Sequence, residues 1–298
     1  MEFVRQSDKI PVYLHIPKNA GTYLINVFTN FFVRLVGNAS EFHMQRLSIC
    51  GDGFSLTVFV KFNSDYWKTD KNIKQHHFTA PRARKCGFPT LKQYIQNKEL
   101  NILAIVIEPE DGELRCSFEK VHNILRSCKA EGFYFSILRE VFSRQQSLYY
   151  YITGEESRHE PSHKSIKEAS FIDYLSSESC EDSWLIRATT GMKDNWPITE
   201  FWLNQCYNFF NSFDFLIGDI KNVDDIINQS LFSCFKEGLR SSDTNTNLRI
   251  STKIKNKSMS KGKKHYSTLY TKKTKEITAN YFASVIEMFN YEFEDKKC

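Results

Sequence analysis

Alternation of apolar and polar positions predicts strands in the first half of the chain. Residues 11–16 (PVYLHI) alternate in this way, and residues 54–62 and 101–108 show a similar strand pattern. The run 133–138 (FYFSIL) is apolar almost throughout, which is typical of a central parallel strand buried on both faces. These four segments are therefore expected to form the core of a sheet.

Apolar positions at helical spacing follow several of these strands. The spacing predicts helices over 22–36, where Gly37 supplies a stop, over 117–129, with Ser117 as a cap, and over 140–152. The second half of the chain is mostly helical, with one short strand expected over 213–218. The helices expected there cover 168–176, 182–190, 197–212, 222–238 and 271–289.

Strands and helices alternate without repeats or an obvious linker, which favours a three-layer α/β architecture. A chain of 298 residues is long enough for one large α/β domain. We therefore expect a single domain over 1–298, with a central, mostly parallel sheet flanked by helices and a helical C-terminal half.

Composition is that of an ordinary globular protein, with 41% hydrophobic and 25% charged residues. The net charge of +5 says little, but 249–275 contains ten Lys or Arg and no Asp or Glu, so positive charge is concentrated there. The eight cysteines form no CxxC pair, and no apolar run is long enough to span a membrane. These features predict a soluble, cytoplasmic protein without a membrane span.

The stretch LHIPKNAGTYL, residues 14–24, joins a predicted strand to a predicted helix. Backbone N–H groups at the start of a helix lack partners within the helix, and together with the helix dipole they attract anions. Lys18 adds a mobile positive charge and Gly21 allows close approach of a ligand. The alternative is a plain strand-to-helix turn with an exposed lysine. The Walker A pattern is absent because no glycine stands ahead of this lysine at the required spacing.

A second strand-to-helix junction carries Arg139 directly after the apolar run 133–138. Ligands of open α/β sheets bind at the carboxyl ends of the strands, so Arg139 is expected at the same edge as Lys18. Ser143 and Ser147 are four residues apart on the following helix and share a face. Ser147 could join Arg139 on one phosphate. An exposed arginine and a surface serine are the alternative reading.

Together these two segments, HIPKNAGT (15–22) and LREVFSRQQSLY (138–149), resemble the sulfotransferase superfamily that uses 3′-phosphoadenosine 5′-phosphosulfate (PAPS). The resemblance is to the branch related to carbohydrate and membrane-type sulfotransferases. It implies a P-loop-like sulfotransferase fold and transfer of a sulfuryl group to a hydroxyl or nitrogen of a small-molecule or carbohydrate acceptor. The product nucleotide would be 3′-phosphoadenosine 5′-phosphate, and no metal would be needed.

The resemblance also implies roles for individual residues. Lys18 would contact the transferring sulfuryl group, and the loop residues Asn19, Ala20, Gly21, Thr22 and Tyr23 would hold the 5′-phosphate. Arg139 and Ser147 would hold the 3′-phosphate. This chain departs from the family pattern at Asn19 and Ala20, where Thr and Gly are usual, and at Val141, where Pro is usual. None of these departures removes a charge.

The general base and the covering loop are also implied by the resemblance. His77, followed by Thr79 and Ala80, matches a histidine that stands between the two nucleotide-binding elements of that branch, so it is our candidate base. A solvated loop histidine is the alternative, and Asp52 or Glu140 could serve instead.

Asn256, Ser258 and Lys261 in the basic stretch would close over the nucleotide phosphates. Alternatively, the basic stretch binds a polyanionic acceptor or is simply solvated.

Two rival functions remain open from the sequence. A degenerate P-loop kinase or NTPase is disfavoured because no convincing Mg²⁺ carboxylate follows a strand. A nucleic-acid-binding protein could use 249–275, where Tyr266 and Tyr270 stand among the lysines and could stack on bases. The rest of the chain is nearly neutral, so no nucleic-acid partner is expected.

Overall fold

The fold is that of a computed structural model of the 298-residue chain. The described residues are 9–16, 20–36, 42–51, 54–63, 87–97, 100–109, 114–153, 169–176, 184–192, 199–235, 238, 240–244 and 266–294.

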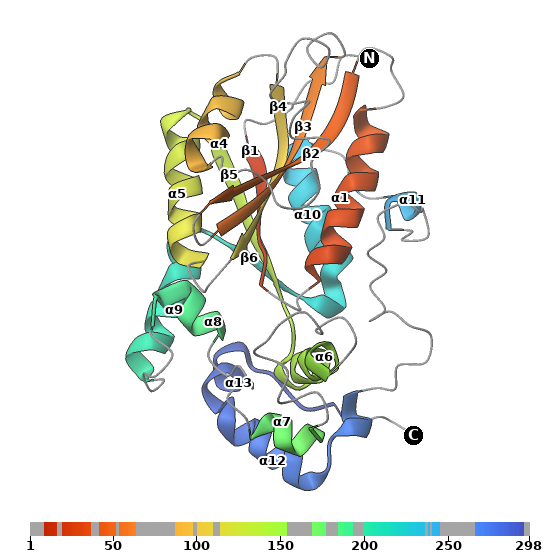
Figure 1. The fold of residues 1–298 in the computed structure, drawn as a ribbon, viewed down its shortest axis with the longest axis vertical. Coiled ribbons are helices and arrows are strands. Elements are labelled where there is room, and N and C mark those ends of the chain that lie inside the picture. The colour runs from red at the N-terminus through yellow and green to blue at the C-terminus, as the bar shows by residue number, and fades with distance from the viewer. Residues whose placement is uncertain are drawn as a thin grey trace.

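Within these residues, six strands form one mixed sheet in the order β2-β3-β4-β1-β5-β6 (Figure 1). Strands β1, β4, β5 and β6 are parallel to one another, and β3 is antiparallel to both of its neighbours. The strands are β1 (Lys9–Leu14), β2 (Phe42–Gly51), β3 (Phe54–Asn63), β4 (Leu100–Pro109), β5 (Glu131–Leu138) and β6 (Leu216–Asp219). The expected mostly parallel sheet with flanking helices is confirmed.

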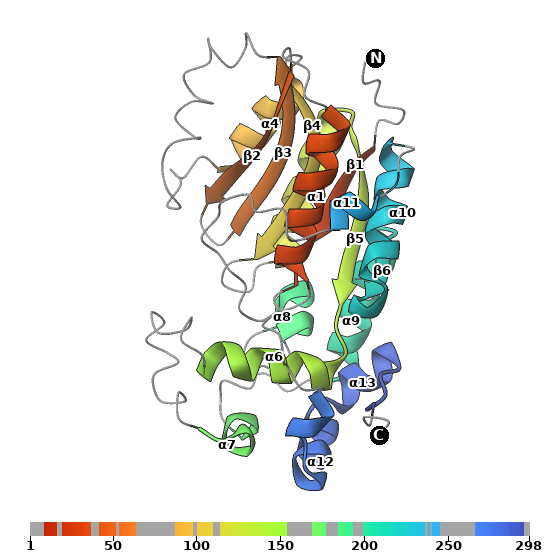
Figure 2. The same cartoon turned by 90° about the vertical axis from the view of Figure 1, so that its right-hand side faces the viewer.

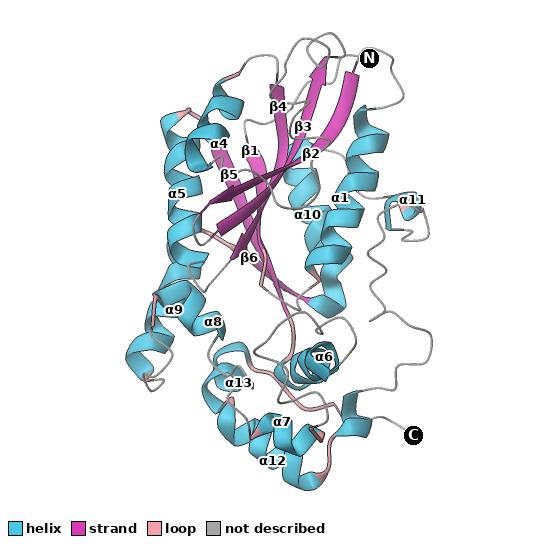
Figure 3. Ribbon diagram, in the orientation of Figure 1, coloured by secondary structure: helices cyan, strands magenta, loops and turns pink. Residues whose placement is uncertain are grey.

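Helices cover both faces of the sheet, and others gather beyond the carboxyl ends of its parallel strands (Figure 3). The α-helices are α1 (Gly21–Val36), α4 (Gly87–Gln96), α5 (Leu114–Ser127), α6 (Val141–Thr153), α7 (Phe171–Leu175), α8 (Trp184–Thr190), α9 (Glu200–Ser212), α10 (Val223–Phe235), α11 (Ser241–Thr244), α12 (Lys272–Tyr281) and α13 (Ala283–Phe289). Two short 3₁₀ helices are η3 (Ile220–Asn222) and η5 (Tyr266–Leu269).

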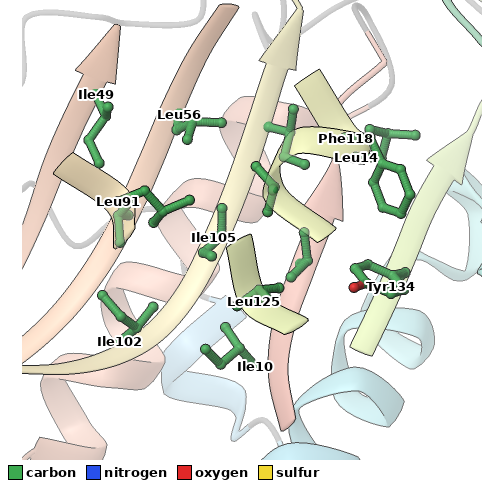
Figure 4. Packing of buried hydrophobic residues seen from close by; sticks show 14 of the residues in the cluster. Ile10, Leu14, Ile49, Leu56, Leu91, Ile102, Ile105, Phe118, Leu125 and Tyr134 are labelled. Atoms are coloured by element: carbon green, nitrogen blue, oxygen red, sulfur yellow. The ribbon is translucent and has the colours of Figure 1, made fainter. Parts of the chain in front are cut away.

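One face of the sheet packs against α4, α5 and α9. Alternation along β1 places Ile10 and Leu14 on this face, because successive side chains of a strand point to opposite sides. They share a buried cluster with Ile105 of β4, Leu91 of α4 and Leu125 of α5 (Figure 4). Burial of these aliphatic side chains is the main favourable term that holds the helices to the sheet.

The opposite face packs against α1 and α10 and is rich in phenylalanine. Phe28 of α1 lies with its ring centroid 5.7 Å from that of Phe59 on β3 and 6.2 Å from that of Phe135 on β5. Phe32 of α1 is equally buried and contacts Phe235 of α10 at 5.6 Å. The helix predicted after the first strand is thus fixed by its aromatic face.

A third apolar cluster holds a helical lobe together at the end of the sheet toward which β5 points (Figure 2). It joins α6 to α7, α8 and the C-terminal helices α12 and α13. The buried Tyr174 hydroxyl of α7 donates a hydrogen bond to Oε1 of Gln145 on α6 at 2.6 Å. The carboxyl ends of the parallel strands therefore face this lobe and not open solvent alone.

Most of the predicted elements are present with shifted ends. The strand predicted over 11–16 runs over Lys9–Leu14, and the strand predicted over 213–218 is Leu216–Asp219. The helix predicted over 117–129 begins at Leu114, so Ser117 is a buried residue inside the helix and not its cap. The prediction of one continuous helix over 271–289 was wrong, because this segment is divided at Phe282 into α12 and α13.

Strand β2 and helix α4 were not predicted, and neither were the short elements η3, α11 and η5. Strand β2 is an edge strand, and in it Leu47 and Ile49 are buried while Arg46 and Ser48 are exposed. Helix α4 carries Pro89 in its first turn, where proline costs no hydrogen bond.

The segment that precedes the basic stretch is anchored on α1 by an ion pair. The Arg34 guanidinium donates to both oxygens of Asp243, with Nη2 to Oδ2 at 2.8 Å and Nε to Oδ1 at 3.0 Å. Asp243 is 1% exposed, and Asn30 donates to its carbonyl oxygen at 3.0 Å. Burial alone would raise the pKa of Asp243, but the bonds from Arg34 and from the Arg240 N–H hold it below its usual range.

Replacing Arg34 should destabilise the fold because it leaves a buried carboxylate without its counter-ion. We expect Arg34→Met to lower the free energy of unfolding by about 3 kcal/mol. Arg115→Met is the matched control, since Arg115 pairs with Glu119 on an exposed helix surface, where such a pair contributes about 0.5 kcal/mol. Urea unfolding of the two variants measures the difference, and equal losses would contradict the anchoring role of Arg34.

Candidate anion site

The two predicted anion-binding junctions are brought together by strand pairing. Strands β1 and β5 are parallel neighbours, with Leu14 opposite Ser136. The buried Ser136 hydroxyl donates to the Leu14 carbonyl oxygen at 2.9 Å, across the pair. Because parallel neighbours end at the same edge, the residues that follow Leu14 and Leu138 leave the sheet side by side.

The turn into α1 has an unusual backbone. Ala20 lies in the left-handed region at φ 65°, and its carbonyl oxygen accepts the Leu24 N–H at 2.9 Å. Ala20 is thus the residue from which α1 begins, and the N–H groups of the first helical turn have no intrahelical acceptors. A left-handed alanine costs about 1 kcal/mol, and such strain concentrates at functional sites.

Gly21 is buried and required by a neighbouring ring. A Cβ atom at this position would lie 2.0 Å from Nε2 of His15, so the imidazole fills the space that a side chain would take. His15 follows β1 directly and stacks on Tyr13 with ring centroids 5.9 Å apart. The sequence pattern predicted that His15 lies inside the strand, whereas in the structure it follows β1 and its ring lies against the start of α1. Thr22 is exposed in the first turn of α1.

The side chain of Tyr23 links α1 to α10. Its hydroxyl donates to Oδ1 of Asp224 on α10 at 2.5 Å. Partial burial and this hydrogen bond raise the pKa of Tyr23 above its usual value. In this structure the phenol therefore ties the start of α1 to the start of α10.

Arg139 lies at the end of β5, half-buried, and its Nε donates to the Ser143 hydroxyl oxygen at 2.8 Å. Burial lowers the pKa of Arg139, the carboxylates of Glu140 and Asp219 raise it, and Arg144 lowers it. The guanidinium stays charged under all ordinary conditions. Ser147 lies one turn further along α6 and is half-buried.

Glu140 lies beside Arg139 and closes the start of α6. It is 3% exposed, and its carboxylate accepts the N–H of Phe142 at 2.5 Å and the N–H of Ser143 at 2.9 Å. Burial raises the pKa of Glu140 to about 7, although the two N–H groups, Lys221 and Arg139 act to lower it. The carboxyl group is thus placed to gain or lose a proton near neutral pH.

A small cavity opens next to these groups, between the strand ends, α6, α8 and the C-terminal helices. The space open to the centre of a water molecule is about 40 Å³, enough for a few waters. Arg139, Arg144 and Gln145 supply its polar lining, and Leu185 and Phe289 are part of its apolar wall. This combination suits an anionic group attached to an apolar ring or chain.

Several of the predicted site residues lie outside the described part of the chain. These are Lys18, Asn19, His77, Asn256, Ser258 and Lys261, together with the alternative base Asp52. Among the described residues, the structure brings the start of α1, with Ala20, Gly21 and Thr22, to the same sheet edge as Arg139. In the same described ranges, no group of three or more His, Cys, Asp or Glu is placed to hold a metal ion.

Sequence reasoning missed three features of this edge. Glu140 was weighed only as a base, although an acidic residue directly before a helix is a cap signal. Ser143 was placed on the correct face but not paired with Arg139. Asp224 carried no sequence signal, because its contact with Tyr23 joins residues 201 positions apart.

No family model, curated protein or solved structure matches this chain. Across the described residues, no helix combines the length and apolar character that a bilayer crossing requires.

Relief of the strain at Ala20 should stabilise the protein. Ala20→Gly is expected to raise the free energy of unfolding by about 1 kcal/mol, because glycine adopts φ 65° without a steric penalty. Ala279→Gly in the interior of α12 is the control and should lower it by about 1 kcal/mol. Chemical denaturation of both variants gives the two signs, and destabilisation by Ala20→Gly would contradict the left-handed turn.

Proposed function

We propose that this protein is a PAPS-dependent sulfotransferase, an enzyme that moves a sulfuryl group to a hydroxyl or nitrogen of a small-molecule or carbohydrate acceptor. The observation that carries the proposal is the parallel pairing of β1 with β5. This pairing sets the start of α1 and Arg139 at one sheet edge, as a ligand with two separated anionic groups requires. The sequence resemblance of these same two segments to the superfamily adds the chemical identity of the ligand.

The anion-binding elements divide the nucleotide between them in this proposal. N–H groups at the start of α1 and the side chain of Lys18 receive the 5′-phosphosulfate. Arg139, oriented by Ser143, receives the 3′-phosphate through charge-assisted hydrogen bonds. Leu185 and Phe289 beside Arg139 offer apolar contacts to the nucleoside, which is larger than the cavity itself.

Sulfuryl transfer then depends on positioning and electrostatics. The acceptor oxygen or nitrogen attacks sulfur in line and forms a new bond to it, while the bond from sulfur to the bridging phosphate oxygen breaks. Lys18 stabilises the charge that develops on that oxygen. The acceptor's proton passes to a base, for which His77 is the candidate.

Replacement of Arg139 should weaken recognition of the 3′-phosphate selectively. We expect Arg139→Gln to lower the affinity for adenosine 3′,5′-bisphosphate about tenfold or more, since a hydrogen bond to a charged group contributes about 1.5–3 kcal/mol. The affinity for adenosine 5′-phosphate should change little. The matched control is Arg126→Gln, an exposed arginine near the end of α5, at the opposite edge of the sheet. Equal losses for both nucleotides would contradict the assignment.

Thermal unfolding with three ligands separates the rival functions. Stabilisation by adenosine 3′,5′-bisphosphate, and by neither ATP with Mg²⁺ nor single-stranded DNA, is the expected result. Stabilisation by ATP with Mg²⁺ alone would favour a kinase or NTPase, and stabilisation by DNA alone would favour a nucleic-acid-binding protein. Transfer itself is tested with labelled PAPS and cell extract, where loss of labelled product in Lys18→Met is expected.

A further inference from the structure

The positive end of α6 is already occupied by an anion that belongs to the chain. The Glu140 carboxylate accepts the N–H groups of Phe142 and Ser143, which are the groups an external phosphate at this helix start would use. A ligand anion at Arg139 therefore binds beside a carboxylate and not on the amides of α6. Ser143 contacts both partners, since its N–H donates to Glu140 and its hydroxyl accepts from Arg139.

Charged and titratable groups surround Glu140. Arg139 at the end of β5 acts on Glu140 directly, and Arg144 on α6 and Asp219 at the end of β6 act on Arg139. Lys221 on η3 acts on Glu140 and also forms a salt bridge with Glu294. Tyr291 approaches from the C-terminal segment, and burial, Asp219 and Glu140 raise the pKa of this phenol, so it stays neutral.

A phosphate or sulfate at Arg139 brings a second negative charge close to this buried carboxylate. Like charges in one site favour the neutral form of a titratable group, so the arriving anion makes protonation of Glu140 more favourable. The protonated carboxyl group keeps an oxygen that can accept an N–H bond from α6. Burial already destabilises the ionised form of Glu140, so this carboxylate can take up a proton near neutral pH.

We propose that anion binding at Arg139 is coupled to the uptake of a proton by Glu140, so that the protonated form of this residue is the high-affinity state. The proton comes from solvent and forms an O–H bond on the carboxylate, and no other bond changes. This inference rests on the proposed function, because it concerns the 3′-phosphate position of the same site. By linkage, affinity should fall as pH rises through the range in which Glu140 ionises.

Isothermal titration calorimetry measures this coupling directly. Adenosine 3′,5′-bisphosphate is titrated into the wild-type protein at pH 7.5 in buffers of different ionisation enthalpy, and the slope gives the protons exchanged. Net uptake is expected. A phosphate with a second pKa of about 6 would instead release protons when bound as the dianion, so the sign distinguishes Glu140 from the ligand.

Glu140→Gln should abolish the uptake, while its amide oxygen can still accept one of the two α6 N–H bonds. Between pH 7 and pH 8 the wild-type affinity should fall up to about tenfold, whereas that of Glu140→Gln should hardly change. Glu119→Gln, an exposed acid on α5, is the control and should behave as the wild type. The measurement on the wild type needs no variant, so it stands even if Glu140→Gln fails to fold.

The outcomes separate the two proposals. Bisphosphate binding without net uptake, or uptake that persists in a folded Glu140→Gln protein, overturns the coupling and leaves the proposed function intact. Inorganic sulfate, which does not titrate in this range, is measured in the same buffers. If sulfate binding is coupled to proton uptake and is lost in Arg139→Gln, while the bisphosphate does not bind, the coupling is supported and the proposed nucleotide ligand is overturned. Absence of binding by both anions overturns both.

Discussion

Parallel pairing of β1 with β5 fixes the register of the sheet and brings the two halves of the candidate site together. Six successive residue pairs, from Lys9 opposite Glu131 to Leu14 opposite Ser136, keep the two strands in register. The buried Ser136 hydroxyl reinforces the far end through its bond to the Leu14 carbonyl. A slip by one residue would turn Ile10 and Leu14 away from the aliphatic cluster and Tyr13 away from the aromatic one, so register is set by the two cores together.

Three local features that each cost stability lie together at the carboxyl ends of these strands. Ala20 takes a left-handed conformation, the half-buried Arg139 is held near a second arginine, and Glu140 keeps a carboxyl group out of water. Packing in the α6 lobe and against α1 holds these groups in place. Departures from local rules of this kind are typical of functional sites, where stability is exchanged for a prepared geometry.

The elements with strong periodicity could be predicted from the sequence, and those with weak signals could not. Helix α1 and strand β5 can be predicted from the sequence, because the aromatic face of α1 and the apolar run of β5 each follow one burial pattern over the whole segment. In strand β2, Leu47 and Ile49 are buried while Arg46 and Ser48 are exposed, a short alternation typical of an edge strand, and α4 carries a proline that usually marks a break. The division at Phe282 depends on packing of α12 and α13 against α6, which no local pattern encodes.

For the candidate site, sequence reasoning reached Arg139 and the start of α1, because strand ends followed by helices are visible in the pattern. It could not reach contacts that depend on tertiary placement, such as Tyr23 with Asp224 and His15 over Gly21. The capping role of Glu140 lay within reach, since an acid between a strand and a helix is a local signal.

In the proposed function, the two strand ends form one site for one doubly anionic nucleotide. A crystal structure of the complex with adenosine 3′,5′-bisphosphate tests it most directly. We expect a single bound molecule, with one phosphate at the N–H groups of Gly21 and Thr22 and the other on the Arg139 guanidinium. Density for the nucleotide elsewhere, or a phosphate on α6 with Glu140 displaced, would contradict it.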